Sequence, residues 1–281
     1  MMILKTVSEL QQNLQKIRDD KLKIGFVPTM GALHPGHLSL VKRAKQENNK
    51  VLVSIFVNPT QFNNPADLMN YPRMPEKDFE MLQSEGTDLV FFPTEEEMYP
   101  QGKASGDDIV LGNLEKVMEG KFRPGHFKGV AQVVTRLFEI AGADNAYFGE
   151  KDFQQLAVIR ELVRQKKFHV KITGCPTVRE PDGLAMSSRN LLLTPEMRKE
   201  ATKISQALFF VRDHRDKKSI PALKKDAVQH IESSGKLKVE YLEVAEEITL
   251  EPVNEFWGSK KYRCLAAVQA GNIRLIDNVQ L

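Results

Sequence analysis

The sequence predicts an α/β protein with a Rossmann-like, mainly parallel sheet, followed by a smaller C-terminal α/β domain. Short apolar segments alternate with longer amphipathic segments through about the first 175 residues. The apolar segments are rich in Val, Ile and Phe and almost continuously hydrophobic, as are strands covered on both faces. Strand, helix and next strand recur at about the 30-residue spacing of a βαβ unit, whose right-handed crossovers make neighbouring strands parallel.

The expected elements of the first domain, residues 1–175, follow in chain order. Strands are predicted at 23–27, 51–57, 88–92, 145–148 and 169–173, and helices at 38–46, 75–84, 127–141 and 153–166. In the third helix the apolar residues from Phe127 to Ala141 fall on one face, and Gly142 suits a left-handed C-cap. Parallel sheets bind ligands beyond the carboxyl ends of their strands, so we expect a site in the segments that follow them.

A change of composition after Cys175 and Pro176 marks the second domain, residues 176–281. Thr194, Pro195 and Glu196 supply an N-cap, a first-turn proline and a first-turn acid, which predict the start of a helix over 197–212. A helix at 222–233 and strands at 239–244, 262–269 and 272–276 follow, with a tight turn at 270–272. The length of 281 residues accommodates one main domain and a smaller one.

Composition excludes several classes of protein. The chain is 41% hydrophobic and 27% charged, which excludes a disordered or collagen-like protein. Its net charge of +3 is shared by both domains, so we expect no nucleic-acid partner. Two cysteines without a C-x-x-C spacing exclude a disulfide framework and that type of zinc site. The same cysteine usage favours the reduced cytoplasm. No apolar segment reaches the length of a membrane helix and the first residues lack a signal-peptide core, so we expect no membrane partner.

The first concentration of reactive side chains comes directly after the first predicted strand, in the segment Met30-Gly31-Ala32-Leu33-His34-Pro35-Gly36-His37. The two histidines lie three residues apart where the next helix opens, so imidazole donors, backbone N–H groups and the helix dipole suit an anion such as a phosphate. Two surface histidines at a helix start explain the same pattern. No third ligand at metal spacing supports zinc, and the metal ligands stay unassigned.

Three further polar groups follow predicted strands or open the second domain. Asn58 and Gln61 suit a small polar substrate or a simple turn. The segment Gly149-Glu150-Lys151-Asp152 places a cation at a helix N-terminus, which is unfavourable unless an anion accompanies it, whereas Asp152 alone suits an N-cap. Met186-Ser187-Ser188-Arg189 offers hydroxyls and a guanidinium to a phosphate chain, or is a solvated linker. The segment 123–126 suits an anion contact or a Pro-Gly turn.

Taken together, these motifs resemble the pantoate–β-alanine ligase (pantothenate synthetase) family, within the nucleotidylyl-transferase superfamily, over essentially the whole chain. The resemblance rests on residues 28–37, 56–59, 61–62, 71–73, 123–127, 148–152 and 182–190. It implies an ATP- and pantoate-binding domain over 1–175, a C-terminal domain over 176–281 that closes over the site, and a homodimer.

The family resemblance also implies a reaction: an ATP-dependent ligase condenses (R)-pantoate with β-alanine through a pantoyl-adenylate, giving pantothenate, AMP and pyrophosphate for vitamin B5 and coenzyme A biosynthesis. ATP enters as a substrate with Mg²⁺, and no organic prosthetic group is expected. Asp78 is an acidic residue near the region where members of the family bind magnesium. The implied catalytic residues are His37 as the acid, with His34 and Lys151. The residues implied to bind ATP are Met30, Gly31, Ala32, Leu33, His34, Pro35, Gly36, His37, Gly149, Glu150, Lys151, Asp152, Val178, Met186, Ser187, Ser188 and Arg189, whereas Gln61 and Gln155 would hold pantoate and Gln61 also β-alanine.

Two other functions fit the same residues. An adenylyltransferase or synthetase acting on another carboxylate or phosphate ester would release no pyrophosphate in response to pantoate. A nucleotide-sensing or RNA-binding module would keep the pocket without turnover. The presence of both histidines, Lys151 and the Ser-Ser-Arg segment, together with the near-neutral charge, disfavours the second of these.

Overall fold

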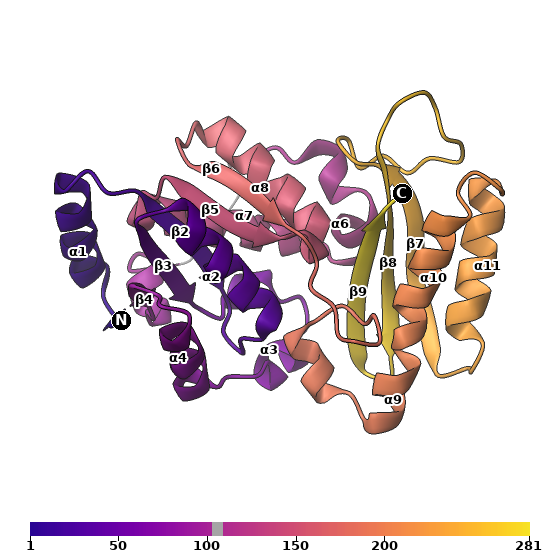
Figure 1. Cartoon of the computed structure of the whole chain (residues 1–281), viewed down its shortest axis with the longest axis horizontal. Coiled ribbons are helices and arrows are strands. Elements are labelled where there is room, and N and C mark those ends of the chain that lie inside the picture. The colour runs from indigo at the N-terminus through magenta and orange to yellow at the C-terminus, as the bar shows by residue number, and fades with distance from the viewer. Residues whose placement is uncertain (103–108) are drawn as a thin grey trace. The chain divides into compact units, whose positions relative to one another are not determined.

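The structure, a computed structural model, describes residues 1–102 and 109–281. The chain divides into two compact units (Figure 1). Unit 1 comprises residues 1–111, 123–150 and 155–176, and unit 2 comprises 112–122, 151–154 and 177–281. Unit 2 is therefore made of the C-terminal hundred residues and two short segments from earlier in the chain.

A six-stranded parallel sheet is the centre of unit 1 within the described residues. Its order is β1-β4-β3-β2-β5-β6, so the chain moves outward from β2 through β3 to β4 and then continues on the other side with β5 and β6. The strands are β1 (Met2–Leu4), β2 (Ile24–Thr29), β3 (Lys50–Ile55), β4 (Leu89–Phe91), β5 (Asn145–Gly149) and β6 (Lys171–Cys175).

Helices cover both faces of this sheet (Figure 1). On one face, α2 and α4 pack around Val27, Val53 and Val90. On the other, α7 contacts α1 and places Phe138 edge-on to Phe26, the strand neighbour of Val27. As predicted, α7 ends at Gly142, whose φ is +49°. The helices whose residues lie wholly or mainly in unit 1 are α1 (Val7–Asp19), α2 (Pro35–Glu47), α3 (Pro65–Asn70), α4 (Pro75–Ser84), α5 (Glu95–Met98), α7 (His126–Ala141) and α8 (Phe153–Lys166).

Unit 2 contains a three-stranded antiparallel sheet in the order β7-β8-β9. Its core packs helix residues such as Leu208 and Leu223 with strand residues such as Val244 and Ala266. The turn from β8 to β9 contains Gly271 at a φ of +61°, as the predicted tight turn requires. The elements are β7 (Leu237–Glu246), β8 (Tyr262–Ala270), β9 (Ile273–Gln280), α6 (Met118–Phe122), α9 (Pro195–Glu200), α10 (Thr202–Asp213) and α11 (Ile220–Glu232).

Several predicted elements need correction. The helix expected at 197–212 is two helices, α9 and α10, interrupted at Ala201, although Thr194 does cap the start and accepts the Met197 N–H at 3.2 Å. The strand expected at 169–173 begins only at Lys171, which leaves His169 exposed in the preceding turn. Elements β1, α1, α3, α5 and α6 were not predicted, because they are short or carry few apolar residues.

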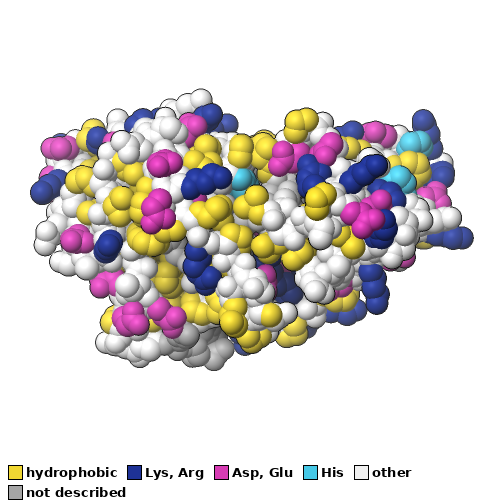
Figure 2. Space-filling view, turned by 90° about the horizontal axis from the view of Figure 1, so that it is seen from below, with side chains coloured by type: hydrophobic (Ala, Val, Ile, Leu, Met, Phe, Trp, Pro, Cys, Tyr) yellow, Lys and Arg dark blue, Asp and Glu magenta, His cyan; other side chains and the backbone are white. Residues whose placement is uncertain are grey.

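On the face drawn in Figure 2, acidic and basic side chains are interspersed with apolar ones. None of the helices in residues 1–102 and 109–281 has the length and apolar character of a membrane span.

Candidate active site

The sheet of unit 1 reverses its winding direction between β2 and β5. Loops that leave two such strands turn to opposite faces of the sheet, which opens a crevice at their carboxyl ends, where α/β proteins bind ligands. The loop after β2 contains the histidine motif, and the segment after β5 begins with Glu150. The fold therefore puts two of the predicted groups at the position where a ligand is expected.

A buried carboxylate from α4 holds the loop between β2 and α2. Asp78, only 1% exposed, accepts the backbone N–H of Ala32 at 2.9 Å and that of Leu33 at 2.7 Å. Gly31 and Ala32 both have left-handed φ angles, +76° and +49°, which turn consecutive N–H groups toward one anion. A Cβ on Gly31 would lie 3.0 Å from Oδ2 of Asp78, so glycine fits closely there. Asp78, which the resemblance suggested only as an acid for magnesium, anchors the histidine loop through both of its oxygens.

The two histidines lie together at the start of α2. His34 is the N-cap, and its Nδ1 accepts the N–H of Gly36 at 3.1 Å. Because Nδ1 accepts, the proton of the neutral His34 ring lies on Nε2, which is then a donor. The rings of His34 and His37 are 4.0 Å apart between centroids, with an angle of 42° between their planes. His34 is thus a helix cap, as the simpler explanation held, and it also forms a close imidazole pair with His37.

Gln61 lies beside this motif after β3, in a short 3₁₀ turn over Pro59–Gln61. Its Nε2 is 2.7 Å from Sδ of Met30, so it contacts the first residue of the predicted ATP segment. The backbone carbonyl of Gln61 accepts a hydrogen bond from Nδ1 of buried His126 at 2.8 Å. Nη1 of Arg123 lies 3.0 Å from Nε2 of the same His126 ring. The Pro-Gly turn predicted for 123–126 is present, with the His126 N–H donating to the Arg123 carbonyl at 3.0 Å. The side chains of Arg123 and His126 also position Gln61, a role that the sequence did not predict.

Asn58 is buried, and its amide groups bond within unit 1. Its Nδ2 donates to the carbonyl of Gly129 at 3.1 Å, and its Oδ1 accepts from the Tyr99 hydroxyl at 3.0 Å. A Cβ on Gly129 would lie 2.4 Å from the carbonyl oxygen of Thr60, so the turn and α7 are in close contact. Of the two amides that follow β3, Asn58 shapes the turn and Gln61 contacts the histidine motif.

The predicted residues after β5 are divided between the units. Gly149, Glu150 and Gln155 belong to unit 1, and Gln155 is half-buried in the first turn of α8. Lys151 and Asp152 belong to unit 2, with 3.7 Å between Nζ of Lys151 and Oδ2 of Asp152.

The last predicted group lies wholly in unit 2. The Met186 N–H donates to the carbonyl of Val178 at 3.0 Å, which closes a turn over 178–186. Ser187 then caps a 3₁₀ helix, Ser188–Leu192, with its hydroxyl accepting the Arg189 N–H at 3.3 Å. Ser187, Ser188 and Arg189 are therefore held in an ordered turn, not in a solvated linker.

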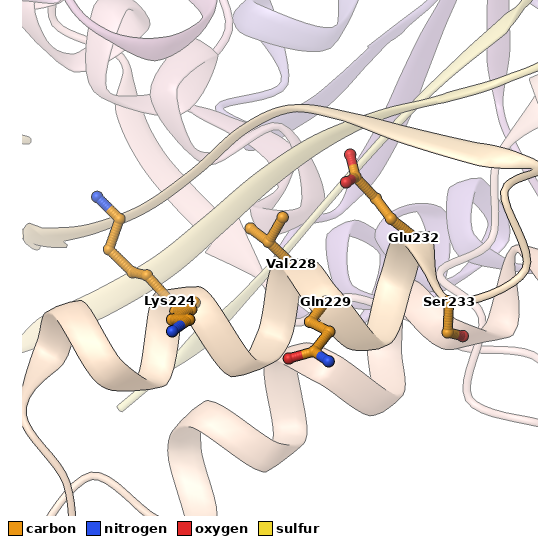
Figure 3. A pocket seen from close by; sticks show the side chains of 6 residues that line it. Lys224, Val228, Gln229, Glu232 and Ser233 are labelled. Carbon is orange, nitrogen blue, oxygen red and sulfur yellow. The ribbon is translucent and has the colours of Figure 1, made fainter.

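A surface hollow in unit 2 lies along α11 (Figure 3). Its lining side chains are Lys224, Lys225, Val228, Gln229, Glu232 and Ser233. Among the residues that the structure describes, none of those predicted for a site lines it.

Comparison with known proteins decides the family. A family model described as pantoate-beta-alanine ligase matches residues 2–280. The chain belongs to the pantoate–β-alanine ligase family. It is 46% identical to a pantothenate synthetase of Bacteroides thetaiotaomicron over 100% of this chain and 99% of the relative. It is 50% identical to a pantothenate synthetase of Azobacteroides pseudotrichonymphae over 99% of each.

Solved structures of pantoate–β-alanine ligases have the same fold. Pantothenate synthetase from Thermus thermophilus is 43% identical and aligns with a TM-score of 0.93 over 100% of this chain and 99% of that one. The ligase from Francisella tularensis, complexed with beta-gamma ATP and beta-alanine, is 38% identical with a TM-score of 0.83 over 100% and 97%. The predicted family, fold class and ligase activity are thus confirmed.

Proposed function

We propose that the protein joins (R)-pantoate to β-alanine in two steps that share one site. The pantoate carboxylate attacks the α-phosphorus of Mg-ATP in line, which expels pyrophosphate and leaves a pantoyl-adenylate. The neutral amine of β-alanine then attacks the activated carbonyl and releases AMP. Membership of the ligase family supports this reaction, and the related Francisella tularensis ligase was crystallised with beta-gamma ATP and beta-alanine.

The observation that carries the proposal is the imidazole pair at the point where the sheet reverses direction. Two anions must approach each other in the first step, so catalysis depends mainly on alignment and on neutralising charge at the α-phosphate. Nε2 of His34 is a donor because its Nδ1 caps α2, and the His37 ring lies tilted beside it, with 4.0 Å between the ring centroids. We assign to this pair the stabilisation of the phosphate oxygens, with His37 as the acid.

The remaining roles follow from the family resemblance. Lys151 stabilises the α-phosphate and the departing pyrophosphate, and Ser187, Ser188 and Arg189 bind the phosphate chain. Gln61 and Gln155 hold pantoate, and Gln61 also contacts β-alanine. The hydrogen bond from Nδ1 of the His126 ring to the backbone carbonyl of Gln61 supports this assignment, because it fixes the main chain from which the Gln61 amide projects. The other ATP contacts are Met30, Gly31, Ala32, Leu33, Pro35, Gly36, Gly149, Glu150, Asp152, Val178 and Met186.

Mg²⁺ enters with ATP in this proposal. Among the described residues no group of three or more His, Cys, Asp or Glu side chains is arranged to hold a metal ion. Magnesium in ATP-dependent enzymes is bound mostly by phosphate oxygens and water, with one or two carboxylates, so such a group is not required. Both oxygens of Asp78 accept N–H groups, which leaves the exposed Asp152 carboxylate better suited to a water-mediated contact. The homodimer rests on the resemblance alone, and the cytoplasmic location on the composition of the sequence.

The proposal is tested by following pyrophosphate and AMP separately. We expect exchange of labelled pyrophosphate into ATP with pantoate alone, and net AMP formation only when β-alanine is added. Pyrophosphate exchange that does not depend on pantoate would indicate an adenylyltransferase for another acid. A panel of short hydroxy acids would then identify that acid. AMP that accumulates equally without β-alanine would contradict the ligase assignment.

A further inference from the structure

A buried polar network in unit 2 joins the two segments of that unit to which we have assigned ATP contacts. One segment is Lys151–Asp152, and the other is the segment 178–189, which contains the turn over 178–186. The network is centred on Asp277 and Asn278, neighbouring residues of β9 that are each 3% exposed. Neither residue belongs to the motifs that carry the predicted function.

Asn278 holds the Lys151 segment. Its Nδ2 donates to the carbonyl of Lys151 at 2.8 Å, and its Oδ1 accepts from Nη1 of Arg263 at 2.6 Å. The guanidinium of Arg263 also lies 3.8 Å from the centre of the Phe153 ring, two residues beyond Lys151. Because Arg263 can only donate, the amide oxygen must face it and the amide nitrogen must face the Lys151 carbonyl. The chemistry of the neighbours therefore requires an asparagine at this position in one orientation.

Asp277 holds the turn that leads to Ser187. Its carboxylate accepts two hydrogen bonds from Arg179, at 2.7 and 2.9 Å, in the paired geometry that a guanidinium and a carboxylate prefer. Arg179 donates further to the carbonyl of Gly183 at 3.0 Å and to that of Asn278 at 3.2 Å. Arg179 and Gly183 both lie within the 178–186 turn, so this turn is tied to the same strand.

The two attachments come from consecutive residues of one strand. Side chains of neighbouring strand residues point to opposite faces, so β9 presents Asp277 to one segment and Asn278 to the other. The strand is fixed by its pairing with β8 from Arg263 to Ala270. A rigid strand thus keeps the backbone of Lys151 and the turn before Ser187 and Arg189 in constant relation.

We propose that Asp277 and Asn278 are positioning residues for adenylate formation. They act through Lys151 and through the Ser187–Arg189 turn, and the inference rests on the proposed function of those residues. An error of about 1 Å in the placement of a catalytic group can cost about 10²-fold in rate, which gives such an attachment its value. A network that served only to stabilise unit 2 would affect adenylate formation equally with and without the Lys151 side chain.

A double-mutant cycle separates the two roles. We expect Asn278→Ala to slow single-turnover formation of pantoyl-adenylate by about 10- to 100-fold, within the range that displacement of a catalytic group produces. In a Lys151→Ala background the same change should slow the residual reaction by less than about threefold, because the group that Asn278 positions is already gone. Equal slowing in both backgrounds would overturn the proposal. Asp277→Asn in an Arg189→Ala background gives the matching test for the other segment.

Two further variants test whether slower adenylate formation results only from a loss of folding. Asn278→Asp has almost the same shape but sets a carboxylate oxygen against the Lys151 carbonyl, so it should slow adenylate formation while the Arg263 contact is kept. Ile231→Val removes one methyl group from α11, at a fully buried site outside the network, and should lower the Tm without slowing the reaction. Slowing by Ile231→Val in proportion to its loss of Tm would contradict the inference. Absence of any pantoate-dependent exchange in the wild type would instead overturn the proposed function.

Discussion

The two ends of the parallel sheet in unit 1 use carboxylates in opposite ways: Asp88 is partly buried, whereas Asp78 is fully buried. At the amino end Asp88 accepts the Val51 N–H at 2.9 Å and lies 3.0 Å from Nζ of Lys50. Burial raises the pKa of Asp88, but the Val51 N–H and the lysines outweigh it and hold this pKa below its ordinary value. At the carboxyl end, burial raises the pKa of Asp78 above its ordinary value, because the Leu33 and Ala32 N–H groups offset only part of the desolvation.

This difference distinguishes Asp88, which stabilises the fold, from Asp78, which positions functional groups. The charge of Asp88 is balanced by cations, so it stabilises the starts of β3 and β4. Ionised Asp78 costs free energy in the fold, and it holds a loop in which Ala32, a residue with a Cβ, has a left-handed φ of +49°. Unfavourable local free energies of this kind are tolerated in proteins where they hold functional groups in place. The group held in place here is the histidine motif.

Removing His37 should give the largest contrast between the two ends. A positioned acid contributes about 10²- to 10⁴-fold to a rate, so His37→Gln should slow single-turnover adenylate formation by a factor in that range. The matched control is His169→Gln, which changes an exposed histidine just before β6 at the amino end. Comparable slowing by both substitutions would contradict a catalytic role for the histidine pair at the start of α2.

Lysines offer a second contrast. Lys151→Ala should slow adenylate formation by roughly 10²- to 10³-fold, the cost of losing one donor to a developing charge. Lys171→Ala removes an exposed lysine at the amino end of β6 and should leave the rate unchanged. Rapid-quench measurement of the adenylate with excess enzyme tests both, and an unchanged rate for Lys151→Ala would exclude this residue from the mechanism.

The same contrast shows how far the sequence predicted the molecule. The apolar face of α7, the Gly142 cap and the hydrophobic strands are local patterns, and they indicated the sheet and the position of the histidines correctly. The contact of Asp78 with Leu33 joins residues 45 positions apart, and that of Asp277 with Arg179 joins residues 98 apart. No local period marks such partners, because tertiary packing brings them together. The sequence therefore predicted the groups proposed for chemistry better than the groups that hold them in place.

Exchanging each carboxylate for an amide should separate activity from stability. In Asp78→Asn one amide oxygen replaces two acceptors and the NH₂ group faces a loop N–H, so the loop shifts; we expect about tenfold slower adenylate formation. Asp88→Asn removes the charge that pairs with Lys50 and should lower the free energy of unfolding by about 1 kcal/mol without slowing the reaction. Urea unfolding and single-turnover rates on both variants make the comparison, and loss of activity in Asp88→Asn alone would reverse it.

The smallest expected effect is a difference in the pH dependence of stability. Since the folded pKa of Asp88 is lowered, its stabilisation is present above the unfolded value of about 3.9 and is lost as the pH falls through the folded value. Since the folded pKa of Asp78 is raised, ionisation destabilises the fold as the pH rises from about 3.9 through the folded value. In urea unfolding between pH 3 and 7, the wild type should therefore gain stability relative to Asp88→Asn as the pH rises, and lose it relative to Asp78→Asn. Each slope stays below about 1.4 kcal/mol per pH unit, the limit for one proton, and slopes of the same sign would show that the two carboxylates do not differ in this way.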